Sequence, residues 1–128
     1  GGSYSRGTVT PQPGINIRSA NLPEMPPLRG WSSLRWIHRR AFAEFGTVAV
    51  NRQSLVSADL KELPTAGYAL LNTKIGATWG KVSASFSIDN LANRFYYEHL
   101  SYYRDPFSAG VKIPEPGRSL FVQLRYSL

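Results

Sequence analysis

The sequence predicts an all-β fold: an antiparallel, up-and-down sheet of about six strands that forms a segment of a larger transmembrane β-barrel. Apolar and polar residues alternate in long segments, of about ten or more residues, which suits strands tilted across a bilayer. The connections alternate between very short turns and long loops, as in outer-membrane barrels. The last strand runs to the end of the sequence, as expected where it pairs with the first strand and leaves no edge in lipid.

The first half of the chain predicts three strands. Residues 1–9 form a weak strand, and residues 10–27 form a loop because prolines and glycine interrupt it. Residues 28–37 and 40–51 form a hairpin around a turn at 38–39. Leu28, Leu34 and Trp36 share one face of the first of these strands. In the second, Ala41, Ala43, Phe45, Thr47 and Ala49 share one face, and the other face carries Phe42, Glu44, Val48 and Val50.

Three further strands are predicted at residues 67–79, 82–91 and 119–128. A tight turn at Gly80 and Lys81 joins the first two, and loops at 52–65 and 92–117 complete the connections. The apolar face of the last two strands is expected to meet lipid and carries Val82, Ala84, Phe86, Ile88, Leu120, Val122 and Leu124. The opposite face carries Ser83, Ser85, Asp89, Gln123 and Arg125, with Phe121 as the one apolar exception.

Alternation alone does not decide where the apolar face is buried. A soluble β-sandwich or small-barrel binding module hides it between layers, whereas a membrane barrel turns it toward lipid. Strand length and the alternation of short and long connections favour the barrel, and the soluble module stays as the alternative. Trp31, Trp36 and Trp79 lie near predicted strand ends, where a membrane barrel places an aromatic girdle.

Four short motifs resemble a known family, in the same order as in that family. The segment from Asp89 to Tyr97 resembles the end of the penultimate strand of TonB-dependent outer-membrane receptors, and the segment from Pro114 to Ser119 resembles the approach to their last strand. The segment from Gly67 to Asn72 resembles one of their strand starts. The segment from Asn21 to Arg29 resembles the proline-rich stretch before an earlier strand.

This resemblance implies a role in nutrient import across the outer membrane of a Gram-negative bacterium. Barrels of this family have about 22 strands and a plugged lumen, so residues 1–128 are expected to be the C-terminal part of the barrel, with the plug and the earlier strands absent. The implied partners are outer-membrane lipid and lipopolysaccharide, the N-terminal plug, the TonB energy-coupling complex through the plug, and a small-molecule or metal-chelate ligand. The ligand would be a ferric siderophore, copper, cobalamin or another scarce nutrient. Lys74, Asp89, Gln123 and Arg125 are expected to face the lumen and the plug.

The net charge of +7 indicates an anionic partner, but the basic residues are dispersed. Nucleic acid is not expected as a partner, because its binding needs basic residues clustered on one face. Arg94, Arg104, Lys112 and Arg118 bracket the last long loop, where they suit lipopolysaccharide phosphates or an anionic ligand. A solvated basic rim is the alternative.

The sequence predicts no enzyme, no cofactor and no metal site. It has no cysteine and two histidines, His38 in the predicted turn and His99 in the last loop. No phosphate loop, dinucleotide fingerprint or nucleophile elbow is present. Aromatic and charged side chains gather in the last loop, and an extracellular loop of this kind could contact a ligand or pack on neighbouring loops. The predicted ligand-binding residues are His99, Tyr102, Tyr103, Arg104 and Asp105.

Overall fold

A computed structural model describes residues 1–10, 14, 20–103 and 111–128 of the chain, with the backbone alone for Tyr102 and Tyr103. The described residues form one open, antiparallel sheet in the order β1-β2-β3-β4-β5-β8, and a separate two-stranded pair, β6-β7. The strand bounds are β1 Gly2–Ser3, β2 Arg29–His38, β3 Ala41–Val50, β4 Tyr68–Trp79, β5 Val82–Asp89, β6 Tyr102–Tyr103, β7 Val111–Lys112 and β8 Ser119–Tyr126. The predicted all-β, up-and-down sheet is confirmed.

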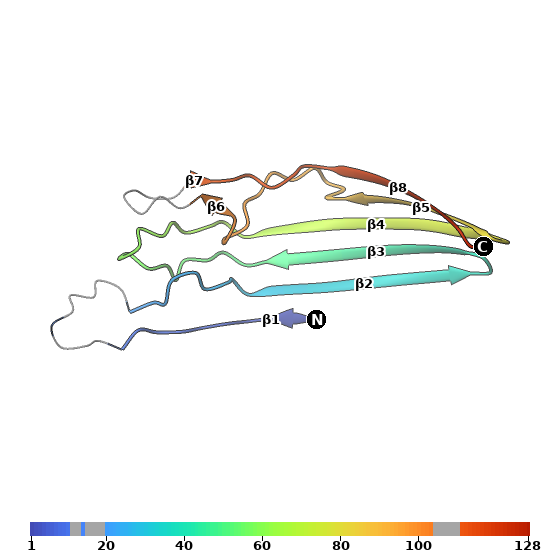
Figure 1. The fold of residues 1–128 in the computed structure, drawn as a ribbon. Coiled ribbons are helices and arrows are strands. Elements are labelled where there is room, and N and C mark those ends of the chain that lie inside the picture. The colour runs from blue at the N-terminus through green and yellow to red at the C-terminus, as the bar shows by residue number, and fades with distance from the viewer. Residues whose placement is uncertain (11–13, 15–19, 104–110) are drawn as a thin grey trace.

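Tight turns lie at one end of the sheet and long connections at the other (Figure 1). The turn between β4 and β5 is at Gly80 and Lys81, as predicted, and Gly80 has a φ of 57°, which glycine adopts without strain. The turn between β2 and β3 is at Arg39 and Arg40, one residue later than predicted, and Arg39 has a φ of 50°. His38 is therefore the last residue of β2 and not a turn residue.

Two other parts of the chain differ from the prediction. The strand expected over residues 1–9 is reduced to two residues in β1, and further along only Thr8 bridges to Asn21. The last long loop contains the short pair β6-β7, which the sequence did not predict. Its prolines limit the ladder, because proline cannot donate a backbone hydrogen bond.

Register places the apolar residues of neighbouring strands side by side. Phe86 of β5 lies between Ile75 of β4 and Val122 of β8, and Leu34 of β2 lies opposite Phe45 of β3. This apolar face is open in the described part of the chain, with no second layer over it. The exposed fractions of Leu34, Val122 and Leu124 are 72%, 74% and 74%. No helix among the described residues is long and apolar enough to cross a membrane.

The three tryptophans do not share one face. Trp36 and Trp79 lie on the apolar face near the turn end, where Trp36 stacks on His38 with ring centroids 5.5 Å apart. Trp31 pairs with Val48 and lies on the polar face. The prediction of a girdle that includes Trp31 is wrong because two residues an odd number of positions apart in one strand point to opposite faces.

A small buried cluster lies on the polar face at the loop end of the sheet. Val50, Tyr68 and Leu70 are its buried apolar members, and Val48 and Tyr96 pack against it. Tyr96 comes from the last long loop, so this loop folds back over the polar face.

The stem of the last long loop is held by asparagine side chains. Asn90 accepts a hydrogen bond from the Arg94 backbone N–H and donates one to the Arg94 carbonyl, each at 2.8 Å. The Asn93 amide oxygen accepts from the Arg118 backbone N–H at 2.9 Å. These bonds connect the two strand ends through asparagine amides and through the backbone groups of Arg94 and Arg118.

Candidate functional site

A buried polar cluster joins the long connections at the loop end of the sheet. His99 Nε2 lies 3.1 Å from Glu62 Oε1, and His99 Nδ1 lies 2.8 Å from the Thr65 hydroxyl. The side chains of His99 and Glu62 are each only 1% exposed. A buried carboxylate is stable only when donors surround it, and here the imidazole supplies one of them.

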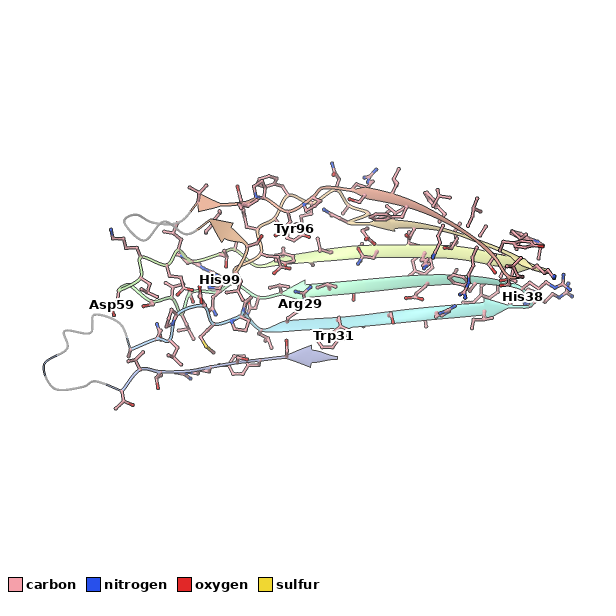
Figure 2. The ribbon with its side chains drawn as sticks, in the orientation of Figure 1. Arg29, Trp31, His38, Asp59, Tyr96 and His99 are labelled. Carbon is pink, nitrogen blue, oxygen red and sulfur yellow. The ribbon has the colours of Figure 1, made fainter. Side chains whose placement is uncertain are left out.

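Backbone donors complete the coordination of Glu62. Ser57 N–H donates to Glu62 Oε2 at 2.7 Å, and Glu24 N–H donates to Oε1 at 2.9 Å. Glu24 belongs to the first long connection, Ser57 and Glu62 to the second, and His99 to the last. We call these residues with Thr65 the loop clasp, because they bind three connections into one body. Figure 2 shows His99 at this end of the sheet, far from His38 at the turn end.

A second cluster ties the last loop to the polar face. Glu98 accepts hydrogen bonds from Arg29 Nη1 at 3.3 Å and from the Tyr68 hydroxyl. The rings of Tyr68 and Tyr96 have centroids 4.4 Å apart. Burial, followed by the nearby carboxylates of Glu115 and Glu98, raises the pKa of Tyr96 above its ordinary value. Tyr96 therefore stays a neutral phenol in its contact with Tyr68.

The structure places the predicted ligand-binding residues differently from one another. Both ring nitrogens of His99 are occupied within the loop clasp, so a direct contact between His99 and a ligand does not fit this arrangement. Tyr102 and Tyr103 form β6. Arg104 and Asp105 lie outside the described residues. Within the described ranges, no group of three or more His, Asp or Glu residues is arranged to hold a metal ion.

An aromatic pocket lies beside the loop clasp, and sequence reasoning did not single it out. Its volume is about 230 Å³, which is below the range of about 300–1,000 Å³ of small-molecule pockets. The residues that line it come from two segments, Thr65 to Tyr68 and Arg94 to Tyr97, together with Lys112. Phe95 and Tyr97 meet edge to face with centroids 5.1 Å apart. The sequence signal for this pocket is the run of aromatic residues from Phe95 to Tyr97 directly after Arg94, which entered the sequence analysis only as part of a family motif.

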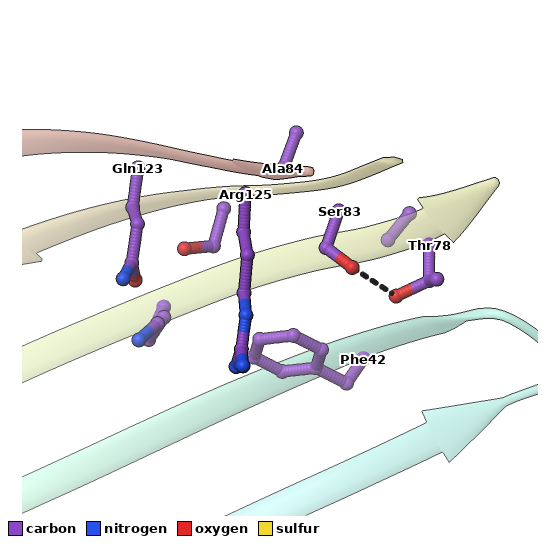
Figure 3. A pocket seen from close by; sticks show the side chains of 9 residues that line it. Phe42, Thr78, Ser83, Ala84, Gln123 and Arg125 are labelled. Atoms are coloured by element: carbon purple, nitrogen blue, oxygen red, sulfur yellow. Dashed lines mark hydrogen bonds between the residues drawn. The ribbon is translucent and has the colours of Figure 1, made fainter. Parts of the chain in front are cut away.

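The polar face of the sheet carries the four residues predicted to face the lumen. Lys74 lies on β4, Asp89 at the end of β5, and Gln123 and Arg125 on β8, and register puts all four on the same face. A groove of about 270 Å³ between these strands brings Lys74, Gln123 and Arg125 together (Figure 3). Asp89 is not among the residues that line it.

Comparison with known proteins finds similarity to solved structures. No family model matches the chain, and no curated protein matches it. Among solved structures, the chain is similar to "Copper transporter OprC", with a TM-score of 0.72 and 26% sequence identity. The similarity covers 83% of this chain and 18% of that chain. The open antiparallel sheet therefore matches a segment of a β-barrel transporter and spans less than a fifth of its length.

Proposed function

We propose that this chain forms part of the barrel wall and the outer loops of an outer-membrane transporter that imports a metal ion or metal complex. One observation carries the proposal: the chain is similar to a copper transporter over most of its length. The two faces of the sheet support it. An uncovered apolar face suits contact with lipid, and a polar opposite face suits a lumen. Large exposed apolar patches are rare on soluble monomers, which disfavours the soluble binding module.

Copper is the substrate that the similarity favours, and the wall described here is not expected to supply the metal ligands. Soft sulfur ligands and imidazoles suit copper. The chain has no cysteine, one methionine and two histidines, and His99 is occupied in the loop clasp. The metal site would then be formed mainly by other segments of the transporter.

The finer parts of the proposal rest on the family resemblance. We infer that the chain is the C-terminal part of a TonB-dependent receptor barrel, whose lumen holds an N-terminal plug coupled to the TonB complex. Outer-membrane lipid and lipopolysaccharide would surround it, and a siderophore is an alternative ligand. Tyr102, Tyr103, Arg104 and Asp105 would reach the ligand from the last loop. The aromatic pocket at Phe95 and Tyr97 lies in the stem of the same loop.

Surface labelling tests the membrane arrangement. The chain has no cysteine of its own. A cysteine at Asp59 in the second long connection should react with a membrane-impermeant maleimide on intact cells, and a cysteine at Lys81 in the tight turn should react only after the outer membrane is opened. Equal labelling of both positions on intact cells, or a protein absent from the outer-membrane fraction, would contradict the proposal.

Metal uptake tests the substrate. Deletion of the complete gene should lower cellular copper in copper-limited medium, measured by mass spectrometry, and the intact gene on a plasmid should restore it. Manganese serves as the control metal. Unchanged copper content together with lowered uptake of a ferric siderophore would move the assignment to the alternative ligand.

A further inference from the structure

The groove on the polar face contains two cations without a described partner. Lys74 and Arg125 make no side-chain hydrogen bond or ion pair with any residue in the described ranges. Glu44 is the cross-strand neighbour of Lys74, but its carboxylate pairs instead with Arg35 Nη1 at 3.8 Å. Three cations therefore share this part of the face with one carboxylate. Such an excess of positive charge favours a negatively charged group in the groove.

Neutral hydrogen-bonding groups surround the two cations. Arg125 extends from β8 across β5 and β4 toward the ring of Phe42 on β3, and Gln123 extends beside it from β8 over β5 (Figure 3). Thr78 and Ser83 lie at the same groove, with their hydroxyl oxygens 3.0 Å apart. A guanidinium, an ammonium and an amide that converge in this way match the acceptors of a carboxylate, because guanidinium can bind both of its oxygens.

The floor of the groove is an aromatic ring in a fixed position. Phe42 lies opposite Gly76 in the register, and a Cβ atom at Gly76 would lie 2.6 Å from the ring. Only glycine permits this close approach. The Arg35 guanidinium lies over the same ring, 4.4 Å from its centroid. The fixed ring offers an apolar surface to the methylene groups that carry a carboxylate in Asp or Glu.

Apolar side chains flank the groove on the face that is otherwise polar. Ile37 pairs with Phe42 and is 65% exposed, and Phe121 pairs with Ser87, the neighbour of Lys74, and is 53% exposed. Exposed apolar residues around a set of polar groups are typical of a contact with another protein surface. A small anion in water gains nothing from them. The flanking residues therefore favour a protein segment as the occupant of the groove.

We propose that this groove receives an Asp or Glu side chain from a protein segment that lies against the polar face, with Lys74 and Arg125 as its charge partners and Gln123 as an amide donor. The proposal rests on the proposed function, in which the polar face lines a lumen occupied by another part of the same protein. Phe42, Ile37 and Phe121 supply the apolar contacts beside the carboxylate. Arg125 is the principal partner, because it can bind both oxygens.

Carbodiimide cross-linking of the complete protein, purified from outer membranes, tests the contact directly. The reagent activates a carboxylate, and an adjacent lysine amine then forms an amide bond. We expect peptide mass spectrometry to find Lys74 joined to an Asp or Glu outside residues 1–128. Lys81, exposed in the tight turn, is the matched control and should not join the same residue. The Lys74→Arg variant keeps the charge and should lose this cross-link while the protein still assembles.

A Lys74 that stays unlinked in the assembled protein, or that links only to Glu44, would overturn the proposal. A second measurement uses Arg125→Gln in the complete protein. It should lower the urea concentration at which ion conductance through the reconstituted protein begins, because the occupying segment is held less firmly. The groove binds small anions instead if the variants change only the inhibition of this conductance by sulfate or acetate, and if neither the cross-link nor the urea threshold depends on these residues. The maleimide labelling of cysteines at Asp59 and Lys81 tests the membrane arrangement independently, so a failure of the groove proposal can be told apart from a failure of the proposed function.

Discussion

A charge placed on the apolar face should destabilise the protein far more than the same charge one residue away. Phe86 lies between Ile75 and Val122 on the apolar face. It is four residues beyond Val82, which at about 3.3 Å per residue and about 45° of tilt corresponds to ~9 Å of depth. Counted from Val82 as the edge of an apolar band about 25 Å tall, Phe86 lies within the middle third of the band.

Arginine at the lipid-facing midplane of a barrel costs about 2–4 kcal/mol. For Phe86→Arg this corresponds to a shift of the folding equilibrium by about 30-fold to about 900-fold. Ser85→Arg places the same side chain on the polar face, beside Gln123. Its neighbours there are polar side chains of the groove and not lipid, so its cost should stay well below that of Phe86→Arg.

The assay is urea unfolding of the complete protein in lipid vesicles, followed by tryptophan fluorescence. The two variants differ by one position and introduce the same side chain, so Ser85→Arg controls for the effect of arginine itself. Equal losses of stability at the two positions would refute the assignment of faces to lipid and lumen. A larger loss at Ser85 would reverse it.

Three further changes have separate readouts. Gly76→Ala should destabilise the barrel by about 1–3 kcal/mol in the same urea assay, because the new methyl group meets the Phe42 ring. Adding Phe42→Ala should recover part of this loss, and additive losses in the double variant would show that the ring is not the obstacle. His99→Leu removes a hydrogen-bond donor from the buried Glu62 carboxylate. Proteases should then cleave the outer loops faster on intact cells, while the melting temperature of the barrel stays the same. An unchanged cleavage rate would mean that the loop clasp does not hold the loops together. Deletion of residues 102–109 should leave barrel assembly normal and weaken uptake, and loss of the assembled barrel would contradict the role given to this loop.

Local alternation was enough to predict most of the sheet. Strand bounds were correct to within one or two residues for β2, β3, β4, β5 and β8, because a strand with one apolar and one polar face has a period of two in its own sequence. The turn before Ala41 was placed one residue early, because no glycine marks it and Arg39 adopts the positive φ instead.

Contacts between distant segments were not predictable in the same way. Glu62 and His99 are 37 positions apart in the chain, and nothing local in either loop indicates that they meet. His99 consequently looked like an exposed ligand contact, although it is buried. The face on which Trp31 lies is a different case, because its odd spacing from Trp36 within one strand indicates the opposite face and its place near a strand end does not.

The sequence by itself determined the strands, the two faces and the alternation of short and long connections, because each depends on residues that are close together in the chain. The tertiary structure alone decided which side chains meet across strands. Lys74 and Arg125 converge on one groove because β5 lies between β4 and β8 in a single register. A shift of one residue in that register would turn either side chain to the opposite face. The apolar pattern of the strands and the tight turn at Gly80 and Lys81 fix the register.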